Sequence, residues 1–121
     1  MRNLICAVLI CSFLLLAGCV TAYDSFEYRG FVKIAAMADK KDCSQDHVNN
    51  MLEESRFLYR YSLHKQNEDS IIQAARELLQ SIEELNMRLH ETNISPHYCT
   101  LKMTGISIIA GTYAETVGKK F

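Results

Sequence analysis

The feature that most constrains the fold is a pair of heptad-spaced apolar patterns in the second half of the chain. The first has intervals of 4, 3, 4, 3 and 4 residues and comprises Ile71, Ala75, Leu78, Ile82, Leu85 and Leu89. The second has the same intervals and comprises Cys99, Met103, Ile106, Ala110, Tyr113 and Val117. Such spacing places apolar side chains along one face of a helix. Additional apolar residues widen the first face, which favours a packed bundle over an isolated coiled coil.

Capping residues divide the chain into four predicted helices. Ser44 and Ser95 stand where N-caps are expected, and Pro96 suits a first helical position. The predicted helices run from Asp24 or Ser25 to Ala38, from Ser44 to about His64, from a cap at Asn67 or Asp69 to the stop at Asn93-Ile94-Ser95-Pro96, and from Ser95 to Gly118. Short connections favour antiparallel neighbours, so we expect an all-α fold, a small antiparallel four-helix bundle. We expect Gly105, Gly111 and Ala114 to let neighbouring helices approach the last one closely.

The N-terminal region has the plan of a secretory signal. Arg2 is followed by an apolar run from Leu4 to Leu16, which is too short to span a bilayer as a stable helix. The run closes with Leu16-Ala17-Gly18-Cys19, which resembles the lipobox of bacterial lipoproteins. This resemblance implies cleavage before Cys19, acylation of its sulfur and anchoring by lipid. The alternative is an ordinary signal-peptide cut after Ala22, which would release a soluble secreted protein.

The lipobox implies a localisation and a domain organisation. Val20, rather than Asp, follows the lipidated cysteine, and by resemblance to enterobacterial lipoproteins this implies the outer membrane, with the domain facing the periplasm. Residues 1–18 are then the signal peptide, 19–25 a lipid-anchored tether and 26–121 one helical domain. The mature chain carries 12 Lys and Arg against 14 Asp and Glu, without a long run of either sign. Nothing in that balance indicates binding to nucleic acid.

Two cysteines remain once the signal and the lipidated residue are set aside. Cys43 and Cys99 would lie in an oxidising compartment, where a disulfide is expected. A reactive thiol and a metal ligand are the weaker alternatives, because neither cysteine has a Cys-x-x-Cys partner or a pair of histidines nearby. In the predicted bundle, the start of the second helix and the start of the fourth lie at the same end, which agrees with this pairing.

No catalytic constellation is recognisable. The four histidines are scattered, and no nucleophile elbow or phosphate-binding glycine loop occurs. His47 and His97 could approach each other beside the disulfide, but two histidines without a further ligand are weak grounds for a metal site. We therefore expect no enzyme activity, no cofactor, no metal and no small-molecule substrate.

Apolar residues beyond the needs of the core are the remaining signal, because they mark partner surfaces when they face solvent. The partner-binding candidates are Phe57, Tyr59, Tyr61, Leu63, Ile72, Leu79 and Met87. The alternative is that these side chains only complete the core of a small bundle.

The lipobox, the length, the four predicted helices and the placement of Cys43 and Cys99 resemble type II secretion pilotins. That resemblance is architectural, and it implies an envelope protein as partner, bound as a helix in an apolar groove. A groove lined by Leu79, Met87 and Tyr61 would favour this role. The chain also resembles small helical immunity or exclusion lipoproteins, which block an incoming toxin, phage or conjugation factor. That second resemblance implies a more polar and charged binding surface.

Overall fold

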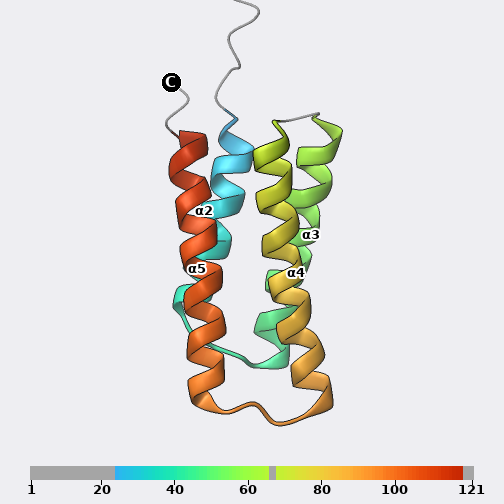
Figure 1. Ribbon diagram of the computed structural model, residues 1–121, viewed down its shortest axis with the longest axis vertical. Coiled ribbons are helices and arrows are strands. Elements are labelled where there is room, and N and C mark those ends of the chain that lie inside the picture. Colours follow the sequence, from blue (N-terminus) through green and yellow to red (C-terminus); the bar gives the residue numbers. More distant parts are fainter. Residues whose placement is uncertain (1–23, 66–67, 119–121) are drawn as a thin grey trace, which may run out of the picture.

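The computed structural model describes residues 24–65 and 68–118, and these form four helices with no strand among them (Figure 1). The helices are α2 (Ser25–Asp39), α3 (Gln45–His64), α4 (Asp69–Glu91) and α5 (Pro96–Gly118). The all-α prediction and the number of helices are confirmed. The predicted signal peptide, Cys19 and residues 19–23 of the predicted tether lie outside the described residues. Asp24 and Ser25, also counted in that tether, belong to the folded domain as the N-cap and first residue of α2.

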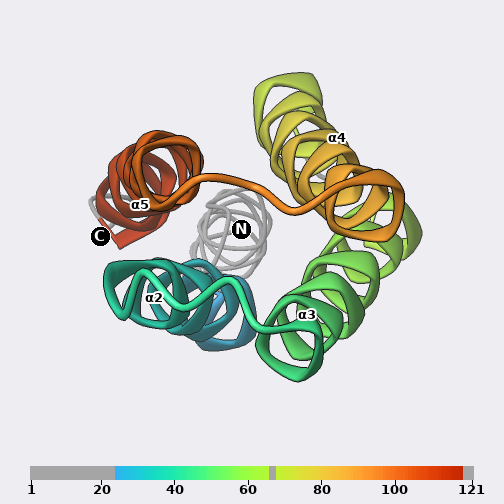
Figure 2. The same cartoon turned by 90° about the horizontal axis from the view of Figure 1, so that it is seen from below.

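The helices run up and down in chain order around a common core (Figure 2). The most extensive packing is within the pairs α2–α5 and α3–α4, and the contacts α2–α3 and α4–α5 complete the ring. Both heptad patterns face inward, except that Leu89 and Tyr113 are only partly buried. Each fully buried Leu, Ile or Phe contributes roughly 1.5–3 kcal/mol. The largest fully buried apolar side chains are Phe31, Ile34, Val48, Met51, Leu58, Leu78, Ile82, Leu85, Met103 and Ile106. No helix of the described segments is long and apolar enough to cross a membrane.

Three of the four helices begin at side-chain caps. Ser44 Oγ accepts from His47 N at 3.4 Å, and Ser95 Oγ accepts from Tyr98 N at 3.1 Å, as the sequence predicts. Asp24 Oδ1 accepts from the backbone N–H groups of the second and third residues of α2. The predicted cap at Asp69 is wrong: Asp69 is the first residue of α4, and the N-cap position is held by Glu68, whose side chain makes no capping hydrogen bond.

The close approach of helices occurs at a different glycine from those predicted. A Cβ added at Gly105 or Gly111 would meet nothing within 4 Å, so that prediction is wrong for these two positions. The packed side of α5 runs through the buried Ala110 and Ala114 instead. At Gly30, in contrast, an added Cβ would lie 2.9 Å from Leu58 Cδ1. Gly30 therefore allows α2 and α3 to pack closely.

The predicted disulfide between Cys43 and Cys99 is present. Its two Cα atoms are 6.1 Å apart, within the usual range, and the bond closes a sequence separation of 56 residues. It joins the connection between α2 and α3 to the first turn of α5. The disulfide therefore fixes the bundle at the end opposite the start of α2.

Candidate functional site

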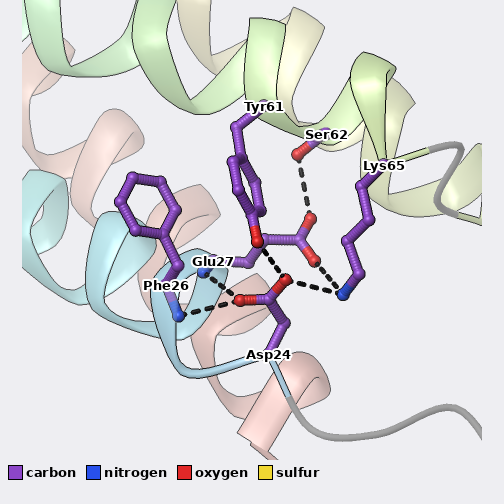
Figure 3. A network of polar contacts seen from close by, with 6 residues as sticks. All are labelled: Asp24, Phe26, Glu27, Tyr61, Ser62 and Lys65. Carbon is purple, nitrogen blue, oxygen red and sulfur yellow. Dashed lines mark hydrogen bonds and ion pairs between the residues drawn. The ribbon is translucent and has the colours of Figure 1, made fainter.

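A buried carboxylate organises the N-terminal end of the bundle (Figure 3). Glu27 is 1% exposed, although charged residues are almost never fully buried unless they are paired. Ser62 Oγ donates to Glu27 Oε2 at 2.9 Å, and Lys65 Nζ donates to Glu27 Oε1 at 3.2 Å. Lys65 Nζ also lies 2.7 Å from Asp24 Oδ2, which accepts from the Tyr61 hydroxyl at 2.6 Å. We call Asp24, Glu27, Tyr61, Ser62 and Lys65 the N-terminal polar network.

The network keeps Asp24 and Lys65 charged. Burial by itself would raise the pKa of Asp24, but hydrogen bonds from Lys65, Tyr61 and two backbone N–H groups outweigh burial and lower that pKa below 3.8. Burial would likewise lower the pKa of Lys65, but its bonds to Asp24 and Glu27 raise that pKa above 10.5. Because each charge faces an opposite charge, the network is suited to joining the start of α2 to the end of α3, not to moving protons.

Acid is expected to weaken this network through Asp24. Because the pKa of Asp24 is lower in the folded chain, its contribution to stability is present above pH 3.8 and is lost as the pH falls through the folded value. Asp24→Asn keeps a capping oxygen but removes the charge, so its unfolding free energy should fall less than that of the parent between pH 5 and pH 2. Urea unfolding at a series of pH values measures the difference. Equal losses in the two proteins would contradict a charged role for Asp24.

A pocket of about 230 Å³ lies beside this network, between α2 and α3. Gly30 supplies no side chain at this point, and Leu58 lies directly against it. Phe26 and Phe57 are 41% and 57% exposed, and their ring centroids are 5.4 Å apart. The lining residues are Phe26, Arg29, Gly30, Lys33, Glu54, Phe57 and Leu58, which we call the α2/α3 pocket.

The aromatic side of the pocket is continuous with the polar network. The Phe26 ring centroid lies 4.4 Å from that of Tyr61, and the Tyr61 hydroxyl is held by Asp24. Across the pocket, Lys33 Nζ lies 2.6 Å from Glu54 Oε1, so an ion pair also links the two helices there. The pocket thus has an apolar centre, one fixed aromatic neighbour and a charged rim, which is the anatomy of a small recognition site.

The structure brings two of the seven sequence-predicted binding residues to this region, Phe57 and Tyr61. Met87 is 59% exposed and lines a different pocket, between α4 and α5, with Glu84, Arg88, Glu91, Tyr98 and Lys102. Tyr59 and Leu79 pack partly against the core, Ile72 is half-buried, and Leu63 is 42% exposed. The predicted groove residues Leu79, Met87 and Tyr61 line neither of these two pockets together.

Sequence reasoning missed Phe26 and Gly30. Their spacing of four residues places them on one face of α2, and that spacing is the signal that could have paired them. Which helix they would face depends on how α2 is rotated against its neighbours, and no local pattern specifies this rotation.

The histidines and cysteines do not assemble a metal site in the described part of the chain. His47 Nε2 lies 2.8 Å from the carbonyl oxygen of Met37, and Cys43 and Cys99 are joined to each other. Within residues 24–65 and 68–118, no group of three His, Cys, Asp or Glu side chains could hold a metal ion.

Comparison with known proteins assigns no relative to this architecture. No family model, no curated protein and no solved structure matches the chain.

Proposed function

We propose that this chain is a lipid-anchored periplasmic module that binds another protein of the bacterial envelope through the α2/α3 pocket. The observation that carries the proposal is the pair of exposed phenylalanines, Phe26 and Phe57, whose rings contact each other at a pocket between α2 and α3. Exposed aromatic side chains around a pocket are the usual anchors of protein interfaces. The pocket is smaller than the roughly 300–1,000 Å³ of typical small-molecule sites, so it suits one side chain of a protein partner.

The anchor and the pocket lie close together in this proposal. Cleavage before Cys19 leaves five residue steps from the lipidated residue to Asp24. At roughly 3.5 Å for each extended residue, Asp24 is held within about 18 Å of the lipid attachment point. The N-terminal polar network fixes the first turn of α2 to α3, so the tether connects directly to a rigid end of the bundle. A partner bound at Phe26 is thereby kept near the outer membrane, as envelope complex assembly of the pilotin kind requires.

Site-specific crosslinking in living cells tests the proposal. A photo-reactive phenylalanine analogue at position 57 should give a defined adduct with a resident envelope protein. The same analogue at Ile108 is the matched control, because Ile108 is 63% exposed on α5 and does not line the pocket. Adducts that are absent at position 57, or identical at both positions, would contradict the proposal.

Protection against an incoming factor is the second candidate function. The observation that favours it is the pocket between α4 and α5, of about 400 Å³, where Met87 stands among four charged side chains. Such a surface suits a polar, charged partner. Crosslinking from position 87 to a toxin, phage or conjugation factor, with none from position 57, would favour this function over assembly.

A further inference from the structure

We propose that the α2/α3 pocket receives a partner helix that packs one large apolar side chain against the Phe26–Phe57 ring pair and places a carboxylate against Arg29. This inference rests on the proposed function, because it names the chemistry of the partner at the same site.

The charges around the pocket specify an acidic partner. Three ionisable side chains line it, and Lys33 is already paired with Glu54 at 2.6 Å. Arg29 forms no ion pair with any residue of the described segments. The rim therefore carries one uncompensated positive charge beside an apolar centre. A carboxylate is its natural complement, since a guanidinium binds both carboxylate oxygens in a bidentate geometry.

The shape of the pocket specifies a side chain that enters from outside. Phe26 and Phe57 come from neighbouring helices and form one tilted ring pair, and the pocket lies beside this pair. The pocket is bounded by the Lys33–Glu54 ion pair, so it accepts a single protruding group rather than a long groove-filling segment. An amphipathic helix presents such a group, with an acidic residue one turn away on the same face.

A membrane surface is the competing occupant, because Phe26 lies near the proposed anchor and a lipid phosphate could also pair with Arg29. The geometry disfavours it. Membrane-binding surfaces present protruding apolar residues within a basic field. Here Glu54 lies on the rim beside Arg29 and Lys33, so the charges around the apolar residues are of both signs and form no basic field.

Synthetic helical peptides test the inference on the mature, lipidated protein in detergent micelles. The probes are alanine-rich peptides that carry one central Leu and either Glu, Gln or Lys four residues before it. Binding is followed by fluorescence polarisation at protein concentrations up to 1 mM. The Glu peptide should bind about fivefold more tightly than the Lys peptide, as expected for partly exposed charge pairs. Replacing the central Leu by Ala, or Phe57 by Ala in the protein, should weaken binding severalfold.

Arg29→Gln should abolish the preference for Glu while leaving binding dependent on the central Leu. Arg56→Gln is the matched control, because Arg56 is exposed on α3 and does not line the pocket. Equal binding of the Glu and Lys peptides, or a preference that survives in Arg29→Gln, would overturn the inference. Flotation of the Cys19→Ala protein with vesicles of anionic phospholipid, lost in both Phe57→Ala and Arg29→Gln, would overturn it in favour of a lipid.

The two proposals fail separately. If position 57 crosslinks to an envelope protein but the peptides show no charge preference, the acidic residue proposed for the partner is wrong and the proposed binding function stands. If position 57 gives no adduct in cells, the binding function itself is contradicted.

Discussion

Reduction of the Cys43–Cys99 disulfide should lower the free energy of unfolding by about 4 kcal/mol, because the bond closes a long loop and limits the freedom of the unfolded chain. In a domain of about 100 residues this corresponds to a fall of more than about ten degrees in melting temperature. Small domains are stable by only about 5–15 kcal/mol, so the loss is a large share of the total. Urea and thermal unfolding, followed by circular dichroism with and without reductant, measure it.

The double variant Cys43→Ser/Cys99→Ser provides the control for that measurement. It should unfold like the reduced parent and should not respond to reductant. An unfolding midpoint that reduction leaves unchanged in the parent would mean that the bridge is absent or contributes nothing. The location of the bond supports a substantial effect, because it joins the α2–α3 connection to α5 at an end where the N-terminal polar network gives no support.

Lys65→Met should be the most damaging single replacement on the surface of the bundle. It removes the ammonium group that lies 3.2 Å from Oε1 of Glu27, a residue that is 1% exposed. Breaking a buried ion pair costs about 3–5 kcal/mol, and the ammonium here is partly in water, so we expect a loss of about 2–3 kcal/mol. Denaturant unfolding of the variant measures the loss.

Lys33→Met is the matched control for Lys65→Met. Lys33 forms a 2.6 Å ion pair with Glu54, but its side chain is 59% exposed, so its loss should cost less than about 1 kcal/mol. The double variant Glu27→Leu/Lys65→Met should recover much of the stability, because an apolar pair needs no charge partner. Equal losses in Lys33→Met and Lys65→Met would contradict the role assigned to the buried carboxylate.

Local sequence patterns were sufficient to predict the four helices. The heptad spacing of α4 and α5 identified the buried face of each, because an inward side chain recurs every three or four residues whatever it packs against. Ser44 and Ser95 marked helix starts because a cap is a contact between residues three apart in the chain. The disulfide followed from cysteine number and from the end of the bundle at which each cysteine falls.

The candidate site could not be predicted in the same way, because it depends on contacts between residues far apart in the chain. Glu27 would be placed on the surface by its charge, and its burial makes sense only with Ser62 and Lys65, more than thirty residues away. Phe26 and Phe57 become a pair only when α2 and α3 take one relative rotation, which Gly30 and Leu58 set by close packing. Glycine spacing in α5 suggested close approach there, but Gly105 and Gly111 face open space.

Fatty-acid labelling of cells is the most direct test of the account, because the proposed lipid at Cys19 would determine the compartment and, with it, the class of partner. The parent protein should incorporate a labelled fatty acid, and mass spectrometry should find Cys19 at its N-terminus. Cys19→Ala should incorporate none. A fully labelled Cys19→Ala protein, or an unlabelled parent cut after Ala22, would contradict the lipid anchor.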